Sequence, residues 1–337
     1  MAALSDLSLG LGAEGTPLTL AVATRWWEVM EPAFKINKNV KQGKGMRVGT
    51  RVDRSARRTV PTIDGSGSFG VELVSKGMGL LFESLLGVGA ATLVSGTTYQ
   101  HLFTLANGVT VPSRTLQTGV VDATGTVNAV SYIGSAVDTW ELELPNDDIA
   151  AVKTSWDCAN YSTAQAYAAP SYAAAPTLFT WANVAITLGG AVTAPTTTAL
   201  ATGGTANTAI RNVKISGDNQ LIKDRFNSGG GGRKSRQLIG DAGLTGELEI
   251  EYIDNVVRDA YLADTELPLT ITLTSAEALS SGFAQVQVVL PAIKLDGEIP
   301  EANNAELPLL KVPFTILDNS TAAQPIWIVT RTSDAAL

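Results

Sequence analysis

Apolar and polar residues alternate with a period of two in several stretches of the chain, which is typical of β-strands that bury one face. The clearest examples are residues 140–144, 152–158, 248–252 and 267–273. Further apolar runs are strand candidates, namely residues 179–188, 283–290, 309–317 and 326–330. The pattern therefore predicts a mainly β protein.

Helical spacing is found in only two short segments. One runs from about Lys76 to Gly87, where apolar residues recur on one stripe and the glycine is placed to end the helix. The second runs from Asn255 to Ala263, with Asp254 as its N-cap. We expect both helices to flank the strands.

Two segments between the predicted strands have the composition of linkers or long loops. Residues 159–178 are rich in Ala, Tyr, Ser and Pro, and residues 189–209 consist largely of Thr, Ala and Gly. Strong strand signals flank the first segment, which makes it the better domain boundary. We predict an N-terminal arm at 1–15, a first domain at 16–158, a linker at 159–176 and a second domain at 177–337.

The two predicted domains share a faint internal repeat. When the chain is shifted by 179 residues, Lys35, Ile36, Lys44, Arg54, Arg57, Gly67 and Glu72 coincide with Lys214, Ile215, Lys223, Arg233, Arg236, Gly246 and Glu251. Both stretches have the same layout: an apolar strand, a basic loop, a glycine-led strand with an acidic face, and a short helix. This predicts a duplicated domain, and two unrelated β domains remain the alternative.

Composition excludes most catalytic and metal chemistry. The 337 residues include one histidine, His101, and one cysteine, Cys158, so a Cys/His zinc cluster and an intrachain disulfide are both impossible. Residues 1–15 lack a signal-peptide pattern, and no apolar run is long enough for a membrane helix. We expect a structural protein without catalytic residues, cofactor, metal or membrane contact, in which His101 and Cys158 are structural residues.

Charge is distributed very unevenly. The net charge is −8, yet residues 35–58 carry nine Lys/Arg and one acid, and residues 211–236 carry seven Lys/Arg and two acids. Such loops suit a nucleic-acid duplex, a solvated hairpin, or docking on the acidic surface of an identical subunit, and the acidic remainder favours the last. The predicted inter-ring or inter-subunit contacts are Lys35, Lys38, Lys41, Lys44, Arg47, Arg51, Arg54, Arg57, Arg58, Lys223, Arg225, Arg233, Lys234 and Arg236.

Two glycine-rich motifs resemble ligand-binding loops without their context. Gly65–Gly70 has the spacing G-x-G-x-x-G, but a strand pattern follows it instead of the helix that a dinucleotide site needs. We interpret these glycines as a hairpin turn and strand start. Gly229–Gly232 lacks the spacing of a phosphate-binding loop, so we interpret it as a flexible hairpin tip.

The ordered series of motifs resembles one known family. Residues 51–58 (RVDRSARR), 65–70 (GSGSFG) and 76–82 (KGMGLLF) are similar to the major tail tube proteins of long-tailed, siphovirus-type bacteriophages. The second half is similar to that family in actinobacterial phages, through residues 178–181, 214–219, 245–252, 290–291, 295–300 and 312–314. The 189–209 loop departs from the resemblance.

The resemblance implies a fold and a set of partners. It implies two tail-tube-like β-sandwich or barrel domains, each contributing four strands to a barrel shared around a ring, with rings stacked into a hollow tube. Implied partners are other copies of the chain, the tape measure protein in the lumen, the tail terminator and distal tail proteins, and double-stranded DNA in transit. The implied location is the tail of the virion, after assembly in the host cytoplasm.

The acidic strand faces then have a predicted place. We expect Glu72, Glu141, Glu143, Glu247, Glu249 and Glu251 to face the lumen and repel DNA phosphates. With two domains per chain, we expect three chains to form a pseudo-six-fold ring, and a ring of six chains is the rival. A secreted or surface β-rich binding module, of the adhesin kind, is the alternative function.

Overall fold

The computed structural model describes residues 7–49, 51–253, 255–296 and 309–337. Its first nine strands are β1 (Leu7–Ala13), β2 (Arg25–Trp27), β3 (Val29–Gln42), β4 (Arg58–Glu72), β5 (Gly87–Ser95), β6 (Thr98–Leu105), β7 (Arg114–Val121), β8 (Val127–Leu144) and β9 (Ala151–Ser162). The later strands are β10 (Val184–Leu188), β11 (Val192–Thr193), β12 (Thr202–Gly203), β13 (Ile210–Asp218), β14 (Gly243–Glu251), β15 (Leu267–Ala278), β16 (Phe283–Leu295), β17 (Leu309–Ile316) and β18 (Trp327–Thr332). The helices are α1 (Gly79–Leu86) and α2 (Val256–Leu262), with 3₁₀ turns η1 (Ser55–Arg57) and η2 (Trp181–Asn183).

Sixteen of the described strands form a single hydrogen-bonded sheet, and β11 pairs with β12 separately. A continuous row runs β3-β4-β9-β8-β13-β14-β17-β16, and every pairing along it is antiparallel. From β8 the sheet also continues through β7, β1 and β2, and from β16 through β15 and β10 and through β18, β6 and β5. The protein is therefore mainly β, as the alternation predicts.

The main apolar core draws on both halves of the chain. Phe82 of α1, Trp156 of β9, Leu248 of β14 and Phe314 of β17 all belong to one cluster of buried side chains. Helix α1 lies on this core, and Gly87 ends it in the left-handed conformation at φ 100°. Both predicted helices are confirmed, although the proposed N-cap Asp254 lies outside the described residues.

The predicted strand over 179–188 begins later than expected. Phe179 is fully buried, but Trp181–Asn183 forms a 3₁₀ turn, and β10 starts only at Val184. Thr180 and Asn183 form a reciprocal capping box that stabilises this turn. The apolar pattern signals burial here, and the local cap decides the backbone conformation.

Two segments expected to be free of the domains are held against the sheet. Residues 7–13 of the predicted N-terminal arm form β1, which pairs with β2 and β7. In the predicted linker, the Tyr167 hydroxyl lies 3.0 Å from the Ser8 hydroxyl, and the Gln117 side chain donates to the Ala166 carbonyl at 3.1 Å. The composition of the linker thus reflects a surface-bound chain segment.

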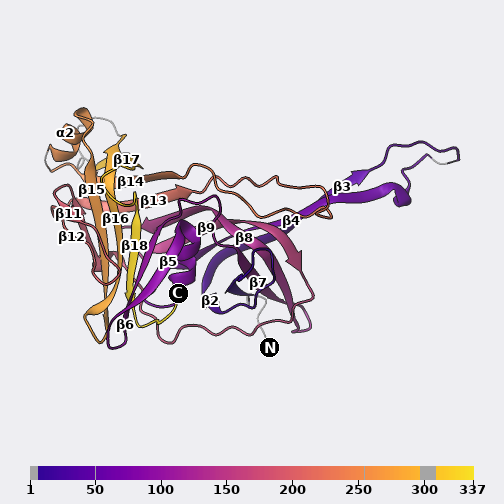
Figure 1. The fold of residues 1–337 in the computed structure, drawn as a ribbon, viewed down its shortest axis with the longest axis horizontal. Coiled ribbons are helices and arrows are strands. Elements are labelled where there is room, and N and C mark those ends of the chain that lie inside the picture. Colours follow the sequence, from indigo (N-terminus) through magenta and orange to yellow (C-terminus); the bar gives the residue numbers. More distant parts are fainter. Residues whose placement is uncertain (1–6, 50, 254, 297–308) are drawn as a thin grey trace.

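The β3–β4 hairpin projects well beyond the rest of the molecule (Figure 1). Its strands pair from Val29 with Val71 to Gln42 with Arg58, so the hairpin continues the sheet outward. The long segment between β13 and β14 runs beside the base of this hairpin, where the Ile63 N–H donates to the Gly232 carbonyl at 3.0 Å. We call residues 40–60 the arm and residues 219–242 the second loop.

Candidate functional site

Charged side chains gather on one face of the central strands, and we call this the charged sheet face. On β8, Trp140, Leu142 and Leu144 are buried in the core, so the alternate residues point to the opposite face. The strands β4, β9, β8, β13, β14 and β17 lie side by side here. The charged residues of the face are Glu72, Glu141, Glu143, Lys153, Arg211, Lys214, Glu247, Glu249, Glu251 and Lys311.

Opposite charges meet across neighbouring strands of this face. Lys214 Nζ lies 2.6 Å from Glu141 Oε2 and 3.9 Å from Glu143 Oε1, and Lys153 Nζ lies 2.6 Å from Glu143 Oε2. Arg211 Nε lies 2.6 Å from Glu251 Oε1. These side chains are partly exposed, so each pair contributes no more than about 1 kcal/mol and is screened by salt. The pairs orient the side chains more than they stabilise the fold.

Neighbouring charged groups shift the pKa values of two residues on this face. A hydrogen bond with the Glu141 carboxyl, together with the Lys153 ammonium, holds the pKa of Glu143 below its ordinary value. The hydrogen bond to Glu143 raises the pKa of Lys153 in return. Glu143 and Lys153 therefore both stay charged at neutral pH, so negative and positive side chains lie next to each other on this face.

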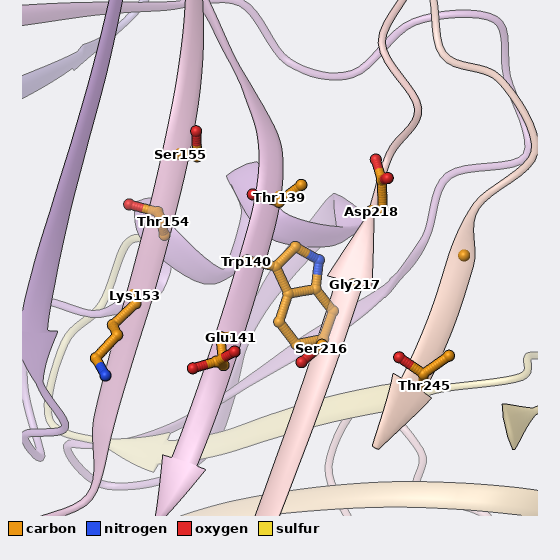
Figure 2. A pocket seen from close by; sticks show the side chains of 11 residues that line it. Thr139, Trp140, Glu141, Lys153, Thr154, Ser155, Ser216, Gly217, Asp218 and Thr245 are labelled. Atoms are coloured by element: carbon orange, nitrogen blue, oxygen red, sulfur yellow. The ribbon is translucent and has the colours of Figure 1, made fainter. Parts of the chain in front are cut away.

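A polar hollow lies on the charged sheet face between β9, β8, β13 and β14 (Figure 2). Small hydroxyl and glycine residues line most of it, with Glu141 and Lys153 at one side and Asp218 at the other. Gly217 is required here because a Cβ would lie 2.3 Å from the Trp140 ring. The hollow is thus the place where β13 passes over a core tryptophan.

All six glutamates predicted to face a lumen lie on the charged sheet face. The surface also carries positive charge, because Lys153, Arg211, Lys214 and Lys311 share it with the glutamates. The alternating runs could show which residues share a face of one strand. They could not show which residues of different strands lie opposite each other, because that depends on strand register.

The arm is the most exposed basic element of the molecule. Met46 and Val48 are both 99% exposed, more than any other large hydrophobic side chain among the described residues. Its base is held by Phe34, whose ring stacks on Phe69 at 6.2 Å and lies 5.1 Å from the Tyr132 ring. Among the described residues no carboxylate forms an ion pair with its cations or those of its base, which are Lys35, Lys38, Lys41, Lys44, Arg47, Arg51, Arg54, Arg57 and Arg58.

The Gly65–Gly70 motif lies inside β4, so its interpretation as a hairpin turn is wrong. It pairs with β3 on one side and β9 on the other. A Cβ on Gly67 would lie 2.2 Å from the Phe34 ring, and a Cβ on Gly65 would lie 2.9 Å from the Tyr132 ring. The glycines therefore leave room for aromatic rings at the base of the arm. Gly229–Gly232, in contrast, lies in a turn at the tip of the second loop, with Gly229, Gly230 and Gly231 exposed and Gly232 half-buried.

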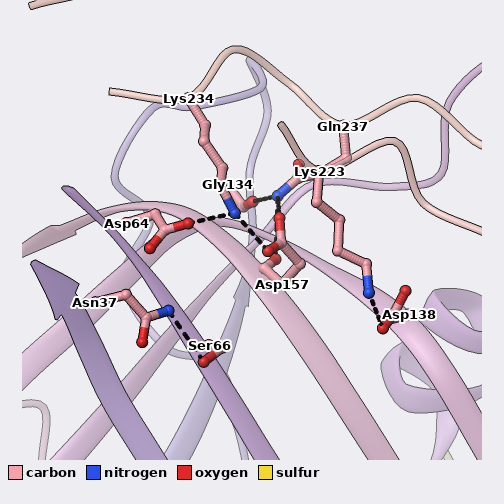
Figure 3. Close-up of polar contacts among 9 residues, drawn as sticks. All are labelled: Asn37, Asp64, Ser66, Gly134, Asp138, Asp157, Lys223, Lys234 and Gln237. Carbon is pink, nitrogen blue, oxygen red and sulfur yellow. Dashed lines mark hydrogen bonds and ion pairs between the residues drawn. The ribbon is translucent and has the colours of Figure 1, made fainter. Parts of the chain in front are cut away.

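The second loop is fastened to the first half of the same chain (Figure 3). Lys234 Nζ lies 2.5 Å from Asp64 Oδ2 on β4 and 2.7 Å from Asp157 Oδ1 on β9. The Gln237 amide donates to Asp157 Oδ2 at 2.8 Å and to the Gly134 carbonyl at 3.0 Å. A lysine, two aspartates and a glutamine thus form a closed polar network between the loop and the sheet.

Burial makes this network energetically important. The Lys234 and Asp157 side chains are only 5% and 8% exposed. Burial alone would lower the pKa of Lys234, but the hydrogen bonds to Asp157 and Asp64 outweigh burial and raise that pKa. The ammonium therefore remains charged, and removing either partner would leave a desolvated charge.

The other cations of the second loop also contact their own chain. Lys223 forms an ion pair with Asp138, and Arg225 donates to the Arg236 carbonyl. The Arg233 guanidinium lies 4.7 Å from the centre of the Tyr161 ring, and Arg236 Nη2 donates to the Val111 carbonyl at 2.7 Å. The two basic loops that look alike in the sequence therefore differ: the arm projects, and the second loop is docked.

The single histidine and cysteine are buried in the fold. His101 Nε2–H donates to the Asp334 carbonyl at 2.8 Å, and burial lowers the pKa of His101. Burial raises the pKa of Cys158 to about 12, which keeps the thiol protonated. Both environments suit structural residues.

The described part of the chain contains no group of three His, Cys, Asp or Glu side chains placed to hold a metal ion. In the same residues no helix is both long and apolar enough to cross a membrane.

In a comparison with protein families, residues 5–315 match the model described as "Phage tail tube protein". Comparison with curated proteins finds no match. The family match spans nearly the whole chain, including the arm, the second loop and every strand of the sheet before β17. The chain therefore belongs to the phage tail tube protein family.

Proposed function

We propose that this structural tail tube protein assembles itself into rings, which stack into the hollow tube that passes DNA out of the virion. The observation that carries the proposal is the continuous row β3-β4-β9-β8-β13-β14-β17-β16. A row of strands that closes on itself through further copies has no free edge and encloses a lumen.

The strand order supports a duplicated unit within the row. In the first half the order is β3-β4-β9-β8-β7-β1, and in the second half it is β13-β14-β17-β16-β15-β10. The two orders correspond strand for strand along the chain. Each unit supplies four strands to the row, and the units join where Val213–Asp218 of β13 pairs with residues 139–144 of β8. We call these two units the first and second repeats.

The same junction suggests how copies join. Residues 34–39 of β3 correspond to residues 213–218 of β13, but β3 pairs only with β4 among the described strands. In a ring, this outer edge of β3 pairs with the far end of the row in the next copy. Three copies then supply 24 strands, which at about 4.8 Å spacing and about 40° tilt place the barrel walls roughly 45–50 Å apart.

The charged sheet face lines the lumen in this arrangement. Its six glutamates outnumber its four cations, so the wall carries a weak negative charge with every cation close to a carboxylate. Such a wall offers no continuous basic track on which phosphates could bind. A tape measure protein before ejection and double-stranded DNA afterwards are the expected contents, and terminator and distal tail proteins are expected at the two ends.

The test is electron microscopy of the purified protein in a metal chelator. We expect rings and tubes whose class averages contain three chains with two repeats alternating around the lumen. A ring of six chains with true six-fold symmetry would contradict the three-chain ring and leave the tube function intact. A protein that stays monomeric at high concentration, by sedimentation, would contradict self-assembly.

A further inference from the structure

The docked second loop provides an internal template for a contact that the arm lacks. The shift of 179 residues that aligns the repeats places residues 40–63 on residues 219–242, so the arm corresponds to the second loop. The second loop lies across the first repeat, which precedes it in the chain. Among the described residues no repeat lies beneath the arm, which projects from the molecule (Figure 1), and none of its cations forms an ion pair there.

Strand registers identify the corresponding surface on the second repeat. Glu72 pairs with Ala151, and its equivalent Glu251 pairs with Leu309, so positions on β9 correspond to β17 with a shift of 158, from 151 to 309. Positions on β8 correspond to positions on β16 with the same shift of 158, because Ser135 of β8 pairs with Cys158 of β9 and Ile293 of β16 pairs with Ile316 of β17.

Positions on β7 correspond in the same way to positions on β15. Arg114 pairs with Ser135, and Leu267 of β15 pairs with Ile293, which gives a shift of 153, from 114 to 267. Three of the residues that cations of the second loop contact on the first repeat have equivalents on the second repeat under these shifts. Val111 corresponds to Asp264, Asp138 corresponds to Asp296, and Tyr161 corresponds to Asn319, beside Asp318.

All three aspartates are exposed, so they are accessible to another chain. Asp264 forms an ion pair with Lys294 at 2.6 Å, Asp296 accepts the Thr315 hydroxyl at 2.6 Å, and Asp318 accepts the Ser320 N–H at 2.8 Å. Each carboxylate keeps a further acceptor site. Where the first repeat offers the second loop a carboxylate, a ring and a carbonyl, the second repeat offers three carboxylates.

We propose that the arm of one copy docks on the second repeat of the neighbouring copy in the same ring. Lys44 faces Asp296 as Lys223 faces Asp138. Arg54 faces Asp318 as Arg233 faces Tyr161, and Arg57 faces Asp264 as Arg236 faces the Val111 carbonyl. The inference rests on the proposed ring, and it makes the arm a contact between neighbouring subunits of one ring.

Charge reversal tests the contact. The variant K44E/R54E/R57E and the variant D264K/D296K/D318K should each form no tubes in electron microscopy. The variant that carries all of these substitutions should form tubes again, because its ion pairs are restored with inverted sign. The matched control K38E/K41E/R58E changes the net charge of the arm and its base by the same amount and should still form tubes. Circular dichroism of each variant establishes that the monomer is folded.

Cross-linking distinguishes the lateral contact from contacts between rings. The variant K44C/D296C should form disulfides on assembly, with bands that stop at the number of chains in one ring, and K38C/D296C should not. Cys158 is buried and does not interfere. An unlimited ladder of bands, an absence of cross-links in assembled tubes, or tubes of normal length from K44E/R54E/R57E would overturn the docking. Failure of the wild-type protein to form rings would instead overturn the proposed function.

Discussion

Lys234 Nζ lies 2.7 Å from Asp157 Oδ1, which joins the second loop to β9 across 77 positions of the sequence. Both side chains are almost completely buried, and Asp64 of β4 completes the arrangement at 2.5 Å from the same nitrogen. Because β4 continues into the arm, this contact also fixes the base from which the arm projects. The two halves of the chain are thereby held together by side chains as well as by the β8–β13 pairing.

Replacing Lys234 with methionine should lower the free energy of unfolding by about 3–5 kcal/mol, because Asp64 and Asp157 then lack their cation in a desolvated site. Urea unfolding at pH 7 measures the change. Adding Asp64→Asn and Asp157→Asn to this variant should recover part of the loss, since the unpaired charges are removed. Lys38→Met, at an exposed position of β3, is the control, with an expected change within about 0.5 kcal/mol. Equal effects of the two methionine variants would refute the importance of the network.

The packing of Phe34 against Gly67 gives a second prediction. Gly67→Ala places a Cβ 2.2 Å from the Phe34 ring and should cost about 1–3 kcal/mol of unfolding free energy through overpacking. Phe34→Ala in the same chain should relieve the clash, so the alanine at position 67 should cost less in that background. Gly108→Ala is the matched control, because its Cβ meets nothing within 4 Å. Thermal and urea unfolding of the four variants measure these differences.

The sequence predicts local features well and long-range contacts poorly. Alternation around Trp140 locates β8 and its buried face, and the spacing of apolar residues before Gly87 locates α1, because both signals depend on neighbouring residues. The Lys234–Asp157 contact has no local signal, since it depends on where a loop folds back. The sequence therefore presented two similar basic loops, and only their tertiary contacts separate the docked one from the arm.

The glycines of β4 illustrate a second limit. Between polar residues, a run such as Gly65–Gly70 has the composition of a turn, and propensity favours that interpretation. In the fold, only glycine fits at positions 65 and 67, because the rings of Tyr132 and Phe34 occupy the space that a Cβ would need. Aromatic residues distant in the sequence thus overrule a local turn preference.

His101 should make stability dependent on pH. Burial lowers its pKa in the folded protein below 6.5, so between pH 6.5 and that lowered value the unfolded chain binds more protons than the folded one. The free energy of unfolding should therefore fall as pH decreases from 7.5 to 5.5, by up to about 1.4 kcal/mol per pH unit. Urea unfolding at the two pH values measures the slope.

His101→Gln is the variant for this test, because its amide can still donate to the Asp334 carbonyl and does not titrate. Its stability should change less than that of the wild type between pH 7.5 and 5.5. The lowered pKa of Glu143 acts only at more acidic pH, below the ordinary carboxyl value. An unchanged slope in the variant would assign the pH dependence to other groups.

The outer edge of β3 gives the last prediction, which concerns ring closure. Successive N–H groups of a strand point to opposite sides, so of Ile36→Pro and Asn37→Pro one removes an outward N–H and the other removes an N–H that pairs with β4. The first variant should keep the circular dichroism and stability of the monomer and form no rings, because an edge that lacks a donor cannot join the next copy. The second should lose stability in urea unfolding. If the variant that keeps its fold still closes normal rings in electron microscopy, the edge of β3 is not the joining surface between copies.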